Sequence, residues 1–224
     1  MLSSLPSIAA HGHVTGIVAN DTWYTGWNAE MRYQTPIPAM AGWPCDNLDN
    51  GIIAPSAFTT ADTICHKSAT NGQASIPITA GSTLSFQWNT WPASHKGLVI
   101  NYIADCGGDC TTVDKTSLKF VKLAAAGWVE GNDPGTWATD TLIADNVTAS
   151  TTIPKGLKSG RYVVRHEVIA LHTVGQANVA QAYPQCVNIE RFYTASDTGI
   201  LFDVYSAFTG YVIPGPAVVA LRRR

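Results

Sequence analysis

The sequence has few charged residues and no long apolar run. Charged residues make up 13% of its 224 residues, and the formal net charge is -2. Nucleic-acid-binding domains carry a basic patch or stripe, so this balance argues against a nucleic-acid partner. The terminal run 222–224 is all arginine, and we interpret it as a solvated tail. A membrane-spanning helix needs about 20 apolar residues, so we expect no membrane span.

Helical periodicity is also scarce. Short runs rich in β-branched and aromatic residues alternate with Gly, Pro and Asn, which is typical of short strands joined by turns. We expect strands at residues 14–18, 81–88, 97–104, 117–123, 151–153, 161–171, 181–189 and 200–205. One short helix is expected at 136–144 with Thr136 as its cap, a turn at 127–134, and a long aromatic loop at 21–44. The pattern predicts an all-β fold, an immunoglobulin-like or fibronectin-like antiparallel β-sandwich with long loops and little helix.

The chain shows no internal repeat and no linker, and its length suits one sizeable core. We therefore expect one domain at 11–216 and a C-terminal tail at 217–224. Residues 1–10 end in small residues and resemble the last part of a secretory signal peptide that is cleaved after Ala10. The segment is shorter than usual and has no positive region, so it is a truncated signal or, alternatively, an ordinary disordered N-terminus.

There are five cysteines. Cys106 and Cys110 flank a flexible Gly-Gly-Asp loop that is short enough for a local disulfide. Cys65 and Cys186 are far apart, and a bridge between them would tie an early loop to the strand at 181–189. Cys45 is then left unpaired. The sequons at Asn20 and Asn146 are candidate glycosylation sites and agree weakly with a secretory route.

Two of the six histidines lie where a metal ion could reach them. If the chain begins at His11, that residue offers its α-amine and its ring to one ion. The pKa of an α-amine, roughly 8, is low enough for a metal ion to displace its proton. The ring of His95, which follows a Trp-Pro-Ala-Ser loop, would add a third nitrogen. Three such nitrogens in one plane favour copper.

A polar cluster on the late strands completes this hypothesis. Gln181, Tyr183 and Gln185 alternate, so they share one face of an extended strand, and His172 lies just upstream. Tyr183 would be an axial ligand, with Gln181 and His172 around it to orient bound oxygen species. The alternative is a hydrogen-bonded core network with structural histidines. The copper hypothesis requires His11 to be the first residue.

Ten sequence blocks, in order, cover essentially all of residues 11–216 and carry a family resemblance. They are His-Gly-His-Val (11–14), Asp-Asn-Gly (49–51), Ile-Cys-His-Lys (64–67), Trp-Pro-Ala-Ser-His-Lys-Gly (91–97), Asn-Tyr-Ile-Ala-Asp-Cys (101–106), Val-Asp-Lys-Thr (113–116), Arg-His-Glu (165–167), Ala-Leu-His (170–172), Gln-Ala-Tyr-Pro-Gln-Cys (181–186) and Tyr-Val-Ile-Pro-Gly-Pro (211–216). With these blocks the chain resembles the fungal lytic polysaccharide monooxygenases of auxiliary activity family 9, formerly glycoside hydrolase family 61.

The resemblance implies a role for each matching residue. Copper would be held by the amine and ring of His11, by the ring of His95 and by the axial Tyr183. His172 and Gln181 correspond to an outer-sphere hydrogen-bonding pair that acts in catalysis. Tyr211 and, as a weaker candidate, Tyr24 correspond to aromatic residues of the substrate face. The pairs Cys65–Cys186 and Cys106–Cys110 correspond to the disulfides of the family.

The resemblance also implies an oxidative activity. An external electron donor, a small reductant or a redox protein, would reduce the copper, and O2 or H2O2 would be the co-substrate. A β-1,4-glucan such as cellulose would be hydroxylated at C1 or C4 beside the glycosidic bond. We expect a secreted, extracellular, monomeric enzyme. The chain departs from the family pattern in its short signal, in Cys45, and between Glu190 and Tyr193, where a Gly/Ser-rich loop is nearly absent.

Two other functions remain open. A non-catalytic, secreted carbohydrate-binding β-sandwich would use the aromatic residues as a sugar platform and the histidines as structural groups. A glycoside hydrolase would need two carboxylic acids about 5–9.5 Å apart. Glutamates are few, and none pairs convincingly in the sequence; they are Glu30, Glu130, Glu167 and Glu190.

Overall fold

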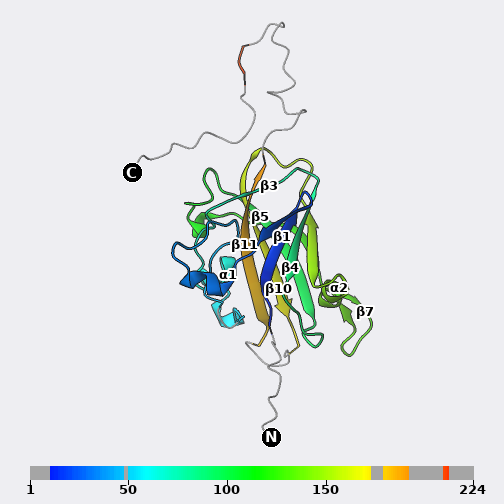
Figure 1. Ribbon diagram of the computed structural model, residues 1–224. Coiled ribbons are helices and arrows are strands. Elements are labelled where there is room, and N and C mark those ends of the chain that lie inside the picture. Colours follow the sequence, from blue (N-terminus) through cyan, green and yellow to red (C-terminus); the bar gives the residue numbers. More distant parts are fainter. Residues whose placement is uncertain (1–10, 48–49, 173–178, 192–208, 212–224) are drawn as a thin grey trace.

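The structure, a computed structural model, describes residues 11–47, 50–172, 179–191 and 209–211. Two β-sheets make up most of it (Figure 1). The four-stranded sheet has the order β2 (Thr22–Thr25), β1 (Val14–Ala19), β4 (Thr83–Trp88) and β9 (Thr148–Thr152). The five-stranded sheet has the order β3 (Ile76–Pro77), β11 (Gln181–Arg191), β10 (Gly160–Ala170), β5 (Gly97–Asp105) and β6 (Val121–Ala126). Neighbouring strands are antiparallel except for β3 and β11. The predicted all-β sandwich is confirmed.

Helices in the described part are short, as expected. They are α1 (Asp62–Cys65), α2 (Ala138–Ala144) and three 3-10 turns at Ala29–Tyr33, Pro55–Ala57 and Lys115–Ser117. None of them is long and apolar enough to cross a membrane. The segments 1–10, 192–208 and 212–224 lie outside the described residues. They include the proposed signal, the strand expected at 200–205 and the tail at 217–224.

Several predicted boundaries were wrong. Residues 127–134 are not only a turn, because β7 (Trp128–Glu130) pairs there with β8 (Thr136–Trp137). Helix α2 consequently begins at Ala138. The carboxylate of Asp140, in its first turn, accepts the backbone N–H of the N-cap residue Trp137 at 2.8 Å. The loop expected at 21–44 contains β2. Two edge strands are displaced, from 117–123 to β6 and from 151–153 to β9.

The main core lies between the two sheets. On β10 the side chains of Val164, His166 and Val168 are buried on the inner face, as the period of two predicts for a strand. They meet Phe86 and Trp88 of β4 from the other sheet. Each large apolar side chain that is fully buried here stabilises the fold by about 1.5–3 kcal/mol.

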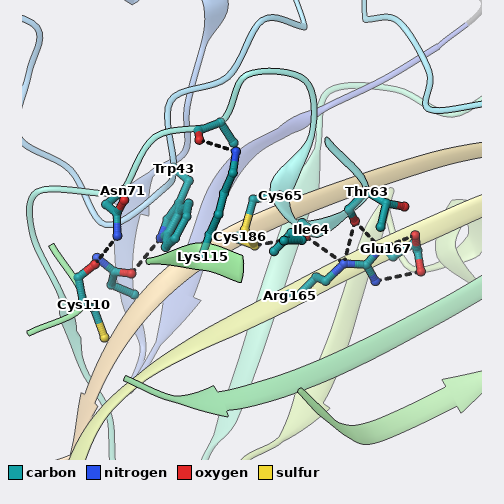
Figure 2. Close-up of a disulfide and its surroundings, with 12 residues drawn as sticks. Trp43, Thr63, Ile64, Cys65, Asn71, Cys110, Lys115, Arg165, Glu167 and Cys186 are labelled. Atoms are coloured by element: carbon teal, nitrogen blue, oxygen red, sulfur yellow. Dashed lines mark hydrogen bonds and ion pairs between the residues drawn. A yellow bond between two sulfur atoms is a disulfide. The ribbon is translucent and has the colours of Figure 1, made fainter. Parts of the chain in front are cut away.

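Loops cover the outer face of the five-stranded sheet, and covalent bonds fasten them to it. The disulfide Cys65–Cys186 joins α1 to β11 (Figure 2). The disulfide Cys106–Cys110 closes the loop after β5. Both predicted disulfides are therefore present. Cys45 is the free cysteine, and burial raises the pKa of its thiol to about 12, so it stays protonated at neutral pH.

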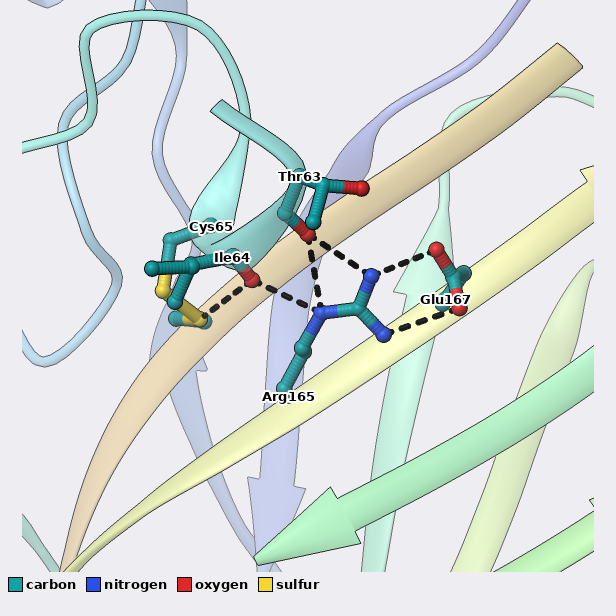
Figure 3. Close-up of polar contacts among 6 residues, drawn as sticks. Thr63, Ile64, Cys65, Arg165 and Glu167 are labelled. Carbon is teal, nitrogen blue, oxygen red and sulfur yellow. Dashed lines mark hydrogen bonds and ion pairs between the residues drawn. A yellow bond between two sulfur atoms is a disulfide. The ribbon is translucent and has the colours of Figure 1, made fainter. Parts of the chain in front are cut away.

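A buried ion pair supports the same layer. Arg165 of β10 forms two hydrogen bonds to the carboxylate of Glu167, at 2.8 and 2.5 Å, and it also donates to the carbonyl oxygens of Thr63 and Ile64 (Figure 3). The last two residues belong to α1, so the guanidinium holds this helix against the sheet. Glu167 is thus engaged in structure. Removing either partner of such a pair typically costs about 3–5 kcal/mol, because a buried charge is left uncompensated.

Candidate metal centre

Two residues of the predicted site, His95 and His172, lie beside strand ends that meet at one end of the sandwich. Ala170, the last residue of β10, pairs with Gly97, the first residue of β5, and with Gln181, the first residue of β11. His95 precedes β5 by two residues, and His172 follows β10 by two residues. The antiparallel register alone therefore brings both histidines to the same end of the sandwich.

His11 joins them from the start of β1. Its ring centroid lies 5.7 Å from that of His95 and 5.7 Å from that of Tyr183. The rings of His95 and His172 are stacked, with centroids 3.6 Å apart and an interplanar angle of 24°. The structure thus brings together four aromatic side chains that the sequence had placed in one site.

Backbone contacts fix the first residues of this segment. His13 N donates to the Asn89 side chain at 2.9 Å, and Asn89 N donates back to His13 O at 3.0 Å. Gly12 is required between them, because a Cβ atom there would lie 2.2 Å from the Thr90 carbonyl oxygen. The segment that carries His11 is therefore hydrogen-bonded to Asn89 and packed closely against Thr90.

His95 is held at every polar group except one. Its backbone N–H donates to Pro92 O at 2.9 Å, and its carbonyl accepts the Trp91 indole N–H at 2.9 Å. Its Nδ1 lies 3.2 Å from the Ser94 hydroxyl oxygen. Nε2 is buried and has no hydrogen-bond partner among the described residues. With a proton on Nδ1 shared with Ser94, the Nε2 lone pair is available to a ligand.

The environment favours the neutral form of His95 and His172. Burial, with smaller contributions from the neighbouring His172 and His11, lowers the pKa of His95 to about 4. The pKa of His172 is also lowered, by burial and by His11. Its Nδ1 is a second buried nitrogen without a partner in the described part of the chain. Neutral imidazole is the form that binds metals.

Tyr183 is almost fully buried beneath this cluster, with 1% of its surface exposed. Its ring packs edge-on against Trp91 at 5.1 Å, and its hydroxyl donates to Gln181 Oε1 at 2.8 Å. Burial raises the pKa of the phenol, so it stays protonated. The predicted common face of Gln181 and Tyr183 is confirmed. Gln185 has a different task, since its Oε1 accepts Val14 N at 2.7 Å and anchors β1.

Ordinary side-chain ligands do not complete a metal site here. Within the described ranges, no group of three or more His, Cys, Asp or Glu side chains is arranged to hold a metal ion. A donor set at this end must therefore include another kind of group. The amine of His11, if it is the first residue, and the phenol of Tyr183 are the groups the geometry offers.

The remaining predicted residues lie elsewhere or at the margin. Tyr211 is 50% exposed. Tyr24 lies on β2, where its partly buried ring packs against the main core. Asn20 and Asn146 are both exposed on turns with positive φ, of 48° and 56°, as a glycan acceptor requires. The roles of these four residues stay predictions.

Sequence reasoning missed the residues that support the centre. Trp91 and Ser94 contact His95 directly, and their place in the same seven-residue block was the available signal. Sequence reasoning also did not single out Tyr33 of the aromatic loop, whose side chain is 76% exposed.

Comparison with known proteins gives a consistent result. The model for Auxiliary Activity family 9 (formerly GH61) matches residues 11–211. The chain is 46% identical to AA9 family lytic polysaccharide monooxygenase F of Emericella nidulans over 96% of this chain and 94% of that protein. It is 43% identical to the monooxygenase cel61A of Hypocrea jecorina, over 98% of this chain and 68% of that protein.

Solved structures show the same similarity. The extended catalytic domain of H. jecorina LPMO9A is 44% identical, with a TM-score of 0.79 over 94% of this chain and 92% of that one. Cel61B of H. jecorina is 37% identical, with a TM-score of 0.76 over 93% of this chain and 100% of that one.

Proposed function

Because this chain belongs to Auxiliary Activity family 9, we propose that it is a copper-dependent lytic polysaccharide monooxygenase that cleaves β-1,4-glucan chains such as cellulose by hydroxylation at C1 or C4. Membership of a family of lytic polysaccharide monooxygenases supports oxidative cleavage of a polysaccharide. The copper ion, the glucan and the position of attack are the finer parts of the proposal.

The copper proposal rests on the hydrogen bonding of His95. Its backbone and its Nδ1 are occupied, whereas Nε2 is buried without a partner among the described residues. A buried nitrogen left in this state is unfavourable by about 1–3 kcal/mol unless something binds it. Nitrogen donors with a neutral imidazole suit copper, so the residues present fit the metal.

The copper ion would be held by the amine and ring of His11, the Nε2 of His95 and the hydroxyl of Tyr183. When bound, it supplies a redox centre that accepts an electron from an external donor and activates O2 or H2O2. The donor is a small reductant or a redox protein.

The side chains around the centre have separate tasks. Tyr183 stays a phenol because burial raises its pKa, so it is a weak neutral ligand that leaves the ion its charge. Gln181 Oε1 accepts the hydrogen bond from the Tyr183 hydroxyl, so the amide N–H groups of Gln181 would be the donors offered to the oxygen co-substrate. His172, stacked on His95, closes one side of the centre. Its Nδ1, which has no hydrogen-bond partner among the residues that the structure describes, is the second group that would orient the oxidant.

The substrate side is an end of the sandwich and not the interior of a barrel. Crystalline cellulose cannot enter a narrow pocket, so a site at strand ends suits it. Tyr211 and, more weakly, Tyr24 are the proposed sugar-stacking residues. We further propose that the protein is secreted, is processed between Ala10 and His11, and acts extracellularly as a monomer.

Product analysis tests this function. Secreted protein that begins at His11 is incubated with copper and swollen cellulose, with and without ascorbate. Aldonic acids or C4-ketoaldoses that form only with reductant support the proposal. Plain oligosaccharides formed without reductant indicate hydrolysis, and binding without any product indicates a carbohydrate-binding module; either result refutes it. His95→Ala is the inactive variant, and Asp145→Asn at the exposed C-terminal end of α2 is its control.

A further inference from the structure

Helix α2 makes two polar contacts with the segment that carries His95. The backbone N–H of Gly97 donates to the hydroxyl of Thr139 at 2.9 Å, and Thr139 is 1% exposed. The ammonium of Lys96 forms an ion pair with the Asp140 carboxylate. Both residues of the helix are in its first turn. The two residues that follow His95 are thus each held by one residue of α2.

The same segment is held from the opposite side by the strand that leads to His172. Lys96 O accepts the N–H of Leu171 at 2.7 Å. Gly97 fits closely against β10, because a Cβ atom there would lie 1.9 Å from the Ile169 carbonyl oxygen. Lys96 therefore lies between helix α2, through its side chain, and the backbone next to His172, through its carbonyl oxygen.

These contacts leave His95 with little freedom to move. Its own N–H and carbonyl are bonded to Pro92 and Trp91, and the next two residues are bonded to α2 and β10. The backbone that carries the His95 ring is thus held by helix α2 as well as by β10. Asp140 serves both structures at once, since its other carboxylate oxygen caps the helix at Trp137 N.

We infer that Thr139 and Asp140 are positioning residues for the proposed copper site, acting on His95 through Gly97 and Lys96. This inference rests on the proposed function. Groups that orient a metal ligand without touching the metal typically change affinity 10- to 100-fold when they are removed. Neither residue touches the substrate or the oxidant, so they act on binding of the ion and on its geometry.

Four variants of the full chain, processed to begin at His11, test the inference. Thr139→Val keeps the shape of the side chain but removes the acceptor for Gly97 N–H. Asp140→Asn removes the ion pair and can keep the helix cap through its amide oxygen. Asp145→Asn removes the same charge at the exposed C-terminal end of the same helix and is the matched control. Thr139→Ser restores a hydroxyl and is the rescue variant.

The readouts are the copper dissociation constant by calorimetry, the electron paramagnetic resonance spectrum of the Cu(II) form, and the melting temperature of the metal-free protein. We expect Thr139→Val and Asp140→Asn to weaken copper binding on the order of 10-fold or more and to shift the spectrum. Asp145→Asn and Thr139→Ser should match the parent in both.

Three results separate failure of the inference from failure of the proposed function. If the parent binds copper tightly and both test variants behave like Asp145→Asn, the inference is overturned and the proposed function stands. A lower melting temperature with unchanged affinity and spectrum also overturns it, because the contacts would then be structural only. If the parent itself does not bind copper, the proposed function fails first. Should Thr139→Val not fold, Asp140→Asn decides the question.

Discussion

Two histidines in this molecule are buried in similar degree but in opposite states. His166 lies in the middle of the core with no exposed surface, its Nε2 accepting the Trp88 indole N–H at 3.0 Å and its Nδ1 bonded to Asn101 at 2.8 Å. His95 lies at the open end, 8% exposed, and its Nε2 has no partner in the described part of the chain. Burial is common to both histidines, so it does not distinguish them. The proposed role of His95 rests instead on its Nε2, which has no partner among the described residues.

The largest expected effect is the loss of copper binding in His95→Ala. The substitution removes one of the proposed donors, so the dissociation constant measured by calorimetry should rise by orders of magnitude. The metal-free protein should keep most of its stability, since Nε2 has no hydrogen-bond partner among the described residues. Asp145→Asn is the control and should bind copper as the parent does. Unchanged affinity in His95→Ala would remove this residue from the ligand set.

The core histidine should show the reverse behaviour. In His166→Ala, Trp88 and Asn101 each lose a buried partner and a cavity forms beneath Phe86, so we expect a loss of about 3 kcal/mol in the free energy of unfolding. Urea denaturation of the metal-free protein measures it. Copper affinity should change far less than in His95→Ala. A loss of stability below about 1 kcal/mol would show that the buried network is not stabilising.

The pH dependence of stability should also come from His166. Burial lowers its pKa to about 3 from a usual value near 6.5, so the unfolded chain takes up a proton below pH 6.5 while the folded chain does not. Stability is therefore complete above pH 6.5 and falls as the pH decreases, by about 2 kcal/mol from this residue between pH 6.5 and pH 5. Denaturation curves of the parent and of His166→Gln at both pH values test this. An equal slope in the two proteins would contradict it.

A smaller effect is expected at Gln181. Replacing it with Leu removes a proposed donor to the oxidant and the acceptor for the Tyr183 hydroxyl, a change worth about one hydrogen bond. Oxidised product should form about tenfold more slowly with copper still bound. Rates under saturating reductant, together with a copper titration, measure both quantities. Normal turnover in Gln181→Leu would exclude it from the outer sphere.

Much of the architecture was predictable from local pattern. The alternation on the strands that became β10 and β11 gives the inner and outer faces of the central sheet, and both disulfides were placed correctly. The hairpin of β7 and β8 was missed, because its exposed residues, such as Trp128, show no buried alternation. Helix α2 was started two residues early, since pairing of β8 with β7 overrides a capping preference at Thr136.

The site was predictable in its members but not in its support. Motif blocks marked His11, His95, His172 and Tyr183, and register explains why they meet. No local pattern could tell the occupied histidine from the unoccupied one, because the partners of His166 are 78 and 65 residues away in the chain. The contacts from α2 to the His95 segment are likewise separated by more than 40 residues.

The central claim is that His11 binds the metal ion through both its α-amine and its imidazole ring. The direct test is a copper titration on two forms of the protein whose masses are verified, one beginning at His11 and one retaining Ala10 before it. We expect one tightly bound copper ion in the first form and binding weaker by orders of magnitude in the second, because a peptide bond removes the amine. Equal affinity in the two forms would contradict the account.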